Sequence, residues 1–441
     1  MTNRTIIWQN CTMETILKTI LAEWREKTLP EIIKRDTELP LPANDKFINK
    51  ATVITGFRRT GKTYLLFSLI KKLLQNYSKE EIVYLNFEDE RLPQKTEVLT
   101  ALIPTCLSFF GKKPKFLFLD EIQNLPLWSK WVRRILDNEK IHLFLTGSSS
   151  KLSSFELPTE LRGRSWEVRV YPLTFKEFLR FKNFKVNLEE INYLENKKAQ
   201  IFHLFEEYLL YGGLPEVVLS PKEKKIELLQ NYFQTVIKRE ILDRYQIKNE
   251  LLIKTVLKLL LNSSYFTLSK LFNNLKSLGF RIGKTTLNNY LDYIESSYFL
   301  KSLLFYSPSV KNQLFYPRKP YFIDQGFITA LSTKFSKNYG RLLENLIFWQ
   351  FQRKENEIFY YQDEKKNEVD FVLMDQEKVK KLYQVCFDIS DFETQEREIK
   401  ALIKGGKKLC CKNLNIITAT KNTNLDKKIK LIDIIFFLLG K

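Results

Sequence analysis

Apolar residues follow two alternating patterns over the first third of the chain. Short runs that are apolar almost throughout predict buried strands at 51–55, 82–88, 115–121 and 141–150. Segments with apolar residues at helical spacing lie between these runs, and one such segment also precedes them. Strands that are apolar on both faces are typical of a parallel sheet covered by helices on both sides. We therefore expect an α/β core.

The strand signal fades after about residue 175 and returns near the end. Residues 176–262 predict mostly helices, and residues 251–300 predict helices with a turn at 279–283. A hairpin is expected at 301–323, and strands alternate with helices again from about 340. The chain therefore combines an α/β core, a helical middle and a second α/β segment.

The charge of the chain indicates what it binds. The 441 residues include 71 Lys and Arg against 51 Asp and Glu, which gives a net charge of +20. Such an excess favours phosphate-rich partners first and an anionic membrane surface second. No apolar run reaches the about 20 residues that span a bilayer, and the five Cys and two His form no zinc-ligand spacing. We expect a soluble, cytoplasmic protein with reduced cysteines.

One glycine-containing segment matches a phosphate-binding loop in full. It has the pattern G-x-x-x-x-G-K-[ST], with a strand before it and a helix after it. Backbone N–H groups of such a loop and the following helix N-terminus face one anion. Lys62 is expected to reach the β and γ phosphates of a nucleotide, and Thr63 to hold Mg²⁺. The predicted nucleotide-binding residues are Gly56, Phe57, Arg58, Arg59, Thr60, Gly61, Lys62 and Thr63.

An acidic pair ends the third apolar run, and its first residue, Asp120, lies 58 residues after Lys62. Asp120 and Glu121 end an apolar run, so both carboxylates are expected at the carboxyl edge of the sheet, beside the loop. Asp120 is predicted to lie in the coordination sphere or the outer shell of Mg²⁺, and Glu121 to orient and polarise the attacking water. The alternative is a strand end with solvated acids.

Further candidates lie after the next strand. Thr146 or Ser148 is placed to hydrogen-bond the γ phosphate or the water, although serines are also common in turns. Arg162 and Arg164 are candidates for a guanidinium that stabilises the transferring phosphoryl group, from the same subunit or a neighbour. The alternative for both is an ordinary surface arginine.

Together these segments resemble a known group of proteins. From about residue 30 to 420 the chain is similar to the prokaryotic AAA-type P-loop ATPases of the AAA_14 type that carry a C-terminal DUF4143 domain. The matching motifs include TGFRRTGKTYLL, FLFLDEIQNLPLWSKWVRRI, YLLYGGLPE and GRLLENLIFWQF. The resemblance implies ATP as the nucleotide, a helical and winged-helix middle, and a nuclease-like C-terminal fold.

The resemblance and the patterns together suggest five segments. These are an N-terminal helical lead-in (1–45), a P-loop AAA-type ATPase core (46–175), a helical lid-like region (176–250), a winged-helix-like domain (251–335), and a DUF4143 domain with a restriction-endonuclease-like α/β fold (336–441).

The predicted winged helix is strongly basic. Residues 251–320 hold two acids, Asp292 and Glu295, and ten basic residues: Lys254, Lys258, Lys270, Lys276, Arg281, Lys284, Lys301, Lys311, Arg318 and Lys319. The second helix of the pair would enter the major groove of DNA. Residues at or near its start are candidates for phosphate or base contacts: Lys284, Thr285, Thr286, Asn288 and Asn289. The alternative is a solvated face that docks a protein.

The C-terminal segment is similar to nuclease folds that need a helix acid, a strand Asp and then E-x-K on the next strand. Glu344 and Asp370 match the first two positions. Gln384 and Cys386 replace the last two, so a carboxylate and an ammonium are missing together. Nuclease activity is therefore not expected.

We interpret the sequence as a Mg²⁺-dependent ATPase that couples hydrolysis to association with double-stranded DNA. The alternatives are a nucleotide-controlled protein adaptor without DNA dependence and, less favoured, an ATP-gated nuclease. Homo-oligomerisation and an unidentified protein partner both stay open.

Overall fold

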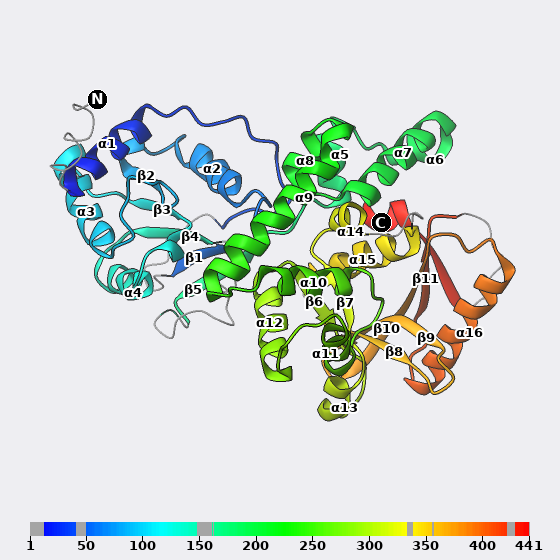
Figure 1. The fold of residues 1–441 in the computed structure, drawn as a ribbon. Helices are drawn as coiled ribbons and strands as arrows, with labels where there is room; N and C mark the ends of the chain where they lie inside the picture. The colour runs from blue at the N-terminus through cyan, green and yellow to red at the C-terminus, as the bar shows by residue number, and fades with distance from the viewer. Residues whose placement is uncertain are drawn as a thin grey trace. The chain divides into compact units, whose positions relative to one another are not determined.

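The computed structural model describes residues 13–40, 50–147, 161, 163–332, 338–354, 357–420 and 428–440. The chain forms two compact units, one up to Val170 and one from Tyr171 onward. Each unit has its own sheet (Figure 1). The finer division into five segments stays a prediction.

The first unit is built on a five-stranded parallel sheet of order β2-β3-β4-β1-β5. Its strands are β1 (Ala51–Thr55), β2 (Ile82–Asn86), β3 (Phe116–Asp120), β4 (His142–Gly147) and β5 (Ser165–Arg169). Its α-helices are α1 (Met13–Glu26), α2 (Lys62–Leu73), α3 (Glu97–Phe110) and α4 (Trp128–Asn138). This confirms the expected α/β core with its parallel sheet.

Alternate strand residues bury themselves on opposite faces of this sheet. Phe118 and Phe144 pack with the apolar side of α2 on one face. Leu117 and Leu143 pack with residues of α1, α3 and α4 on the other. Because both faces are covered, the strands are apolar throughout, as the sequence pattern indicated.

Strand β5 was not expected from the sequence. Its segment, SWEVR, carries polar residues between apolar ones and is only partly buried. It pairs in parallel with β1, from Ala51 opposite Ser165 to Thr55 opposite Arg169. A half-exposed edge strand lacks the continuous apolar run that revealed the inner strands.

The second unit begins with helices, as expected. These are α5 (Phe175–Phe181), α6 (Leu188–Tyr193), α7 (Glu195–Tyr211), α8 (Pro215–Leu219), α9 (Lys225–Thr235), a π-helical segment (Val236–Asp243) and α10 (Glu250–Leu261). The helix pair α11 (Leu268–Ser277) and α12 (Lys284–Ser296) follows. Next come β6 (Leu300–Leu303), α13 (Val310–Phe315) and β7 (Lys319–Phe322). Strands β6 and β7 form the expected antiparallel pair, but a short helix replaces a simple turn between them.

The unit ends in a five-stranded sheet of order β12-β11-β10-β9-β8. Its strands are β8 (Ile358–Gln362), β9 (Glu368–Asp375), β10 (Lys378–Cys386), β11 (Leu414–Thr418) and β12 (Ile429–Asp433). The accompanying helices are α14 (Gln325–Leu331), α15 (Tyr339–Gln352), α16 (Phe392–Lys408) and α17 (Ile434–Leu438). The second α/β segment is thus confirmed, with β12 and α17 as additions that the sequence pattern did not predict.

Within the described ranges, every helix is too short or too polar to cross a lipid bilayer.

Candidate functional site

The segment between β1 and α2 curls into a loop that only glycine permits at its first position. Gly56 has φ +141°, and a Cβ there would lie 2.2 Å from the carbonyl oxygen of Val170. Gly61, which precedes α2, has φ +91°. Both conformations are rarely adopted by residues with a side chain. The local sequence therefore folds as the motif requires.

The loop and the start of α2 form a cradle for an anion. The N-cap residue of α2 is Gly61, which has no side chain to cap the positive end of the helix. The Lys62 side chain folds back into the loop, where Nζ donates to the carbonyl oxygens of Gly56 at 3.0 Å and Phe57 at 3.2 Å. Lys62 is only 5% exposed, so the positive charge of its ammonium lies inside the loop and is largely shielded from solvent. Phosphate is the ligand that such an arrangement favours.

Asp120 accepts hydrogen bonds from three hydroxyl groups. Thr63 Oγ1 and Tyr84 OH each lie 2.8 Å from Oδ2, and Thr146 donates to Oδ1. The carboxylate is almost fully buried, at 1% exposure. Thr63 and Asp120 thereby bring two hard oxygen donors together at the start of α2. Such donors fit Mg²⁺, which is commonly held by one or two carboxylates together with the phosphates of its substrate.

Glu121 follows Asp120 in a left-handed backbone conformation. Its φ is +56°, which is uncommon for a residue with a side chain and is typical of positions under functional constraint. Its amide donates to Thr146 Oγ1 at 3.0 Å, and the Gln123 side chain donates to its carboxylate. Burial raises the pKa of Glu121, the Lys62 ammonium opposes the rise, and the Asp120 carboxylate adds to it. A carboxylate with a raised pKa is suited to accept a proton.

The strand order brings these residues together. Strand β4 lies between β1 and β3, with Thr55 opposite Gly147 and Leu119 opposite Leu145. The carboxyl ends of all three strands meet at one edge, where open α/β sheets bind ligands. Thr146 therefore lies between the loop and the acidic pair and contacts both Asp120 and the Glu121 backbone.

The remaining candidates are placed as follows. Ser148 and Arg162 lie outside the described residues. Arg164 lies at the other end of the sheet, where its carbonyl accepts from Ala51 N at 2.9 Å and its guanidinium pairs with Asp137. Within one chain it is thus a full strand length from the loop, and its role toward a neighbouring copy stays a prediction.

Two polar contacts at the loop were missed by sequence reasoning. Tyr84 on β2 donates to Asp120. Burial of its ring and the negative charge of Asp120 raise the pKa of Tyr84 strongly. Arg58 pairs with Glu88 at 2.9 Å. Tyr84 is part of an apolar strand, so the sequence pattern predicted only a residue of the hydrophobic core.

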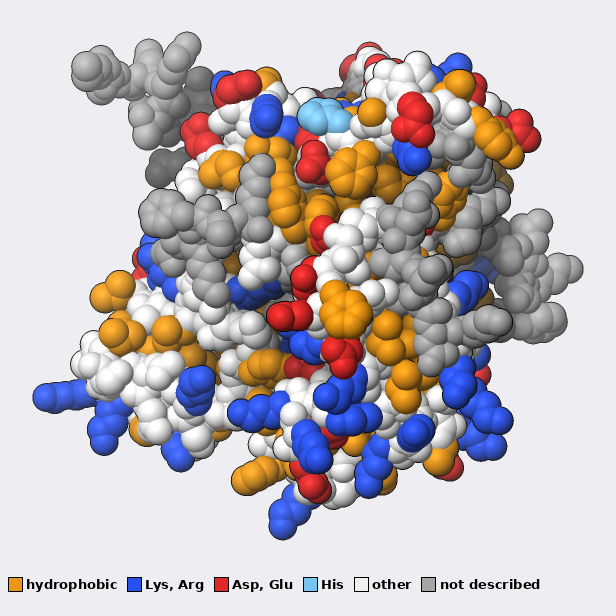
Figure 2. Space-filling view, turned by 90° about the vertical axis from the view of Figure 1, so that its right-hand side faces the viewer, with side chains coloured by type: hydrophobic (Ala, Val, Ile, Leu, Met, Phe, Trp, Pro, Cys, Tyr) orange, Lys and Arg blue, Asp and Glu red, His pale blue; other side chains and the backbone are white. Residues whose placement is uncertain are grey.

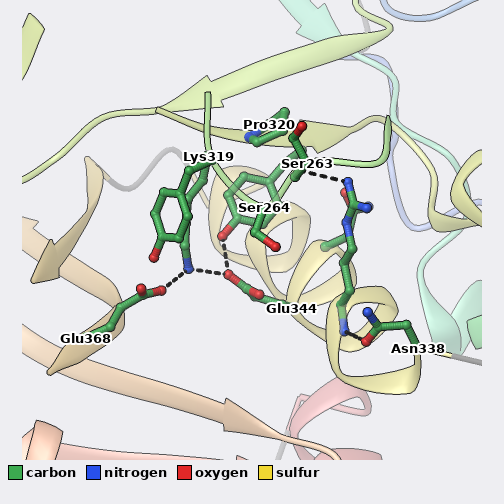
Figure 3. Close-up of a pocket in the computed structure, with 11 residues that line it drawn as sticks. Ser263, Ser264, Lys319, Pro320, Asn338, Glu344 and Glu368 are labelled. Carbon is green, nitrogen blue, oxygen red and sulfur yellow. Dashed lines mark hydrogen bonds and ion pairs between the residues drawn. The ribbon is translucent and has the colours of Figure 1, made fainter. Parts of the chain in front are cut away.

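A second cluster of charged residues lies in the other unit. Glu344, Asp370 and Gln384, which the sequence had singled out, come together: the Asp370 amide donates to Gln384 Oε1 at 3.2 Å. The structure adds Glu368 on β9 and Lys319 on β7. Lys319 Nζ lies 2.5 Å from Glu344 and 2.5 Å from Glu368 (Figure 3). It also lies 3.3 Å from Asp370. The sequence predicted that this site lacks a third carboxylate and an ammonium. That prediction is wrong, because Glu368 supplies the carboxylate and Lys319 the ammonium.

Lys319 also needs a correction in the basic middle segment. It was counted among ten residues available to DNA, but it is 4% exposed and enclosed by carboxylates. Glu368 had a usable signal, because it lies two residues before Asp370 and so on the same face of the strand. Lys319 had none, because it belongs to a different sheet.

The pKa values of the buried groups in this cluster are shifted in different directions. Burial alone would lower the pKa of Lys319, but Glu344 and Asp370 raise it above its ordinary value. Burial and the neighbouring Asp370 raise the pKa of Glu368 to about 9. The Lys319 ammonium, opposing burial, lowers the pKa of Glu344. Glu368 therefore holds a proton more tightly than an ordinary carboxyl group does, whereas the charged forms of Lys319 and Glu344 are favoured.

A comparison with known protein families matches the segment that contains the loop between β1 and α2. Residues 48–179 match the AAA_14 family model, an AAA domain. Residues 202–338 match DUF8612, a domain of unknown function, so this match does not support the expected DUF4143 assignment. Among solved structures, the Walker-type ATPase PABY2304 of Pyrococcus abyssi has 15% identity and a TM-score of 0.44, covering 64% of this chain and 90% of that one. At this score the likeness adds nothing to the assignment.

Two relatives cover most of the chain. The "Uncharacterized protein MJ1544" of Methanocaldococcus jannaschii is 38% identical over 420 residues, 92% of this chain and 90% of that protein. An "Uncharacterized protein" of Haemophilus influenzae is 30% identical over 366 residues, 82% of this chain and 88% of that protein. The chain therefore belongs to the same family as the M. jannaschii protein, and its residues 48–179 form an AAA domain of the AAA_14 type.

Proposed function

We propose that this protein hydrolyses ATP with Mg²⁺ at the loop between β1 and α2. One observation carries the proposal: Thr63 Oγ1 and Asp120 Oδ2 lie 2.8 Å apart beside the glycine-capped N-terminus of α2 and the buried Lys62 ammonium. This arrangement combines groups for a metal ion with groups for a polyphosphate. ATP is proposed from the family of the chain.

Each residue has a distinct role in this proposal. The N-terminus of α2 and Lys62 bind the phosphates, and Thr63 and Asp120 hold Mg²⁺. When bound, Mg²⁺ would supply charge neutralisation at the transferring phosphoryl group. Glu121 accepts a hydrogen bond from the attacking water and polarises it. Thr146 orients the Glu121 backbone, to which it is hydrogen-bonded at 3.0 Å.

Replacing Lys62 by Ala tests the nucleotide site directly. A charge-assisted contact with phosphate is worth about 1.5–3 kcal/mol, so ATP affinity should fall about 10- to 100-fold. Calorimetric titration with ATP and Mg²⁺ measures this change. Lys71→Ala is the matched control, because Lys71 is an exposed residue of the same helix. Equal affinity in Lys62→Ala and wild type would contradict the proposal.

We further propose that ATP hydrolysis is coupled to association with double-stranded DNA. The support is the exposed basic surface of α11 and α12, with Lys270, Lys276, Arg281 and Lys284 all exposed. Thr285, Thr286 and Asn289 at the start of α12 are exposed as well. Figure 2 shows Lys and Arg side chains gathered on the lower part of one face of the molecule. Such surfaces attract the phosphate backbone.

The affinity for duplex DNA should fall steeply as the salt concentration rises if the basic surface binds the phosphate backbone. Replacing both Arg281 and Lys284 by Ala removes two of the exposed charges and should flatten the slope of log affinity against log salt by roughly 2 units. Fluorescence anisotropy across a salt series measures this slope.

The ATPase rate with and without DNA tests coupling. A rate that ignores DNA favours the alternative function, a nucleotide-controlled adaptor for another protein.

A further inference from the structure

Tyr84 holds the Asp120 carboxylate from the neighbouring strand of the first sheet. It lies opposite Phe118 in the pairing of β2 with β3, and Asp120 follows Phe118 by two residues. Alternate residues of a strand point to the same face, so Tyr84 and Asp120 are diagonal neighbours on one face of the sheet. A long aromatic side chain can bridge that separation, and the Tyr84 hydroxyl donates to Asp120 Oδ2 at 2.8 Å.

The ring of Tyr84 is fixed by its packing. Its centroid lies 5.5 Å from the ring of Trp24 on α1 and 5.0 Å from the ring of Phe67 on α2. Trp24 is itself anchored, because its Nε1 donates to the carbonyl oxygen of Ile82 at 2.7 Å. Such a close-packed interior leaves a buried ring little freedom. The hydroxyl of Tyr84 therefore stays directed at Asp120.

The hydroxyl donors leave little of the Asp120 carboxylate for a metal ion. Oδ2 accepts from Thr63 and Tyr84, each at 2.8 Å, and Oδ1 accepts from Thr146. A carboxylate oxygen offers about two acceptor positions, so Oδ2 is saturated. A cation that bonds directly to Oδ2 must displace one of the two hydroxyl hydrogens. Thr63 is half-buried and reaches solvent, whereas Tyr84 and Asp120 are buried.

We propose that Tyr84 is a positioning residue that limits the binding of Mg²⁺ at Asp120 until the nucleotide is present. This inference rests on the proposed ATPase function. In the absence of nucleotide the Tyr84 hydroxyl already satisfies Oδ2, so the carboxylate gains little by capturing a cation. Mg²⁺ sites commonly combine one or two carboxylates with phosphates of the substrate. The phosphate oxygens of the nucleotide would supply the metal affinity that Asp120 by itself does not, so metal and nucleotide bind together.

A purely structural hydroxyl would give the opposite change in metal affinity. If Tyr84 only stabilised the fold, losing its hydroxyl would loosen the site and weaken metal binding. If the hydroxyl competes with the metal ion, its loss leaves a buried carboxylate oxygen short of a partner. A buried acceptor without its hydrogen bond is costly, and a bound cation relieves that cost. The sign of the change therefore distinguishes the two roles.

Tyr84→Phe tests this inference, because it removes the hydroxyl and keeps the ring between Trp24 and Phe67. Electron paramagnetic resonance of the full chain measures binding of Mn²⁺, used in place of Mg²⁺. Without nucleotide, Mn²⁺ should bind at least about 10-fold more tightly to Tyr84→Phe than to wild type. In wild type, a non-hydrolysable ATP analogue should tighten Mn²⁺ binding at least about 10-fold, and in Tyr84→Phe by less. Nucleotide affinity without a metal ion should stay unchanged.

Two controls assign the bound metal ion to this site. Asp120→Asn reports the Mn²⁺ that binds elsewhere on the chain, and in that background Tyr84→Phe should give no gain. Tyr77→Phe is the matched tyrosine control and should leave Mn²⁺ binding unchanged. Tyr77 is half-buried and packs on Phe116, which begins β3 and so lies at the opposite end of the strand from Asp120. Thermal unfolding of each variant checks that the fold is kept.

The possible results separate this inference from the proposed function. ATP turnover in wild type together with Mn²⁺ binding that is no tighter in Tyr84→Phe overturns the inference alone. Wild-type protein that binds no Mn²⁺ even with the nucleotide analogue contradicts the metal site, and with it both proposals. Should Tyr84→Phe fail to fold, wild type decides. Mn²⁺ held through Asp120 as tightly without the nucleotide analogue as with it would then overturn the inference.

Discussion

The Glu121→Gln chain is expected to bind ATP as tightly as wild type and to lose at least about 100-fold in turnover. The change removes the negative charge but keeps the size of the side chain and the backbone contact with Thr146. Without the carboxylate, the attacking water loses the group that polarises it. Phosphate release measures turnover, and calorimetry measures binding.

A matched control comes from another acid of the same unit. Glu97 is exposed at the start of α3, away from the loop, so Glu97→Gln should leave both measurements unchanged. If Glu121→Gln hydrolyses ATP at the normal rate, Glu121 does not act on the water and another group must be found.

Replacing Gly56 by Ala should disrupt the nucleotide loop. The new Cβ would lie 2.2 Å from the Val170 carbonyl oxygen, and the backbone at φ +141° does not suit alanine. Because the obstacle is backbone, it cannot rotate away. We expect a loss of about 2–4 kcal/mol in the free energy of unfolding and a large loss of ATP affinity. Thermal unfolding followed by circular dichroism, and nucleotide titration, measure these effects.

Gly111→Ala separates crowding from backbone strain. Gly111 ends α3 with φ +74°, but a Cβ there would meet no atom within 4 Å. Its substitution should cost only about 1 kcal/mol and leave ATP affinity unchanged. Equal losses in the two variants would show that the contact with Val170 is not what requires glycine at position 56.

The sequence by itself predicted the residues of the proposed nucleotide site and determined the class of fold. The loop from Gly56 to Thr63 and the pair Asp120–Glu121 are local patterns, and their chemistry follows from residue type and spacing. The inner strands were found because burial on both faces leaves a continuous apolar run. The half-exposed β5 leaves no such run and was missed.

Only the tertiary structure decided which distant residues meet. The order of the strands places Thr146 between the loop and the acidic pair, and it places Arg164 at the opposite edge. Lys319 was assigned to a basic surface, because the sequence shows its charge but not the three carboxylates that β9 and α15 bring to it. Periodicity reports how a residue sits on its own helix or strand. Packing between elements determines its neighbours, and in this protein those neighbours decide what its ammonium does.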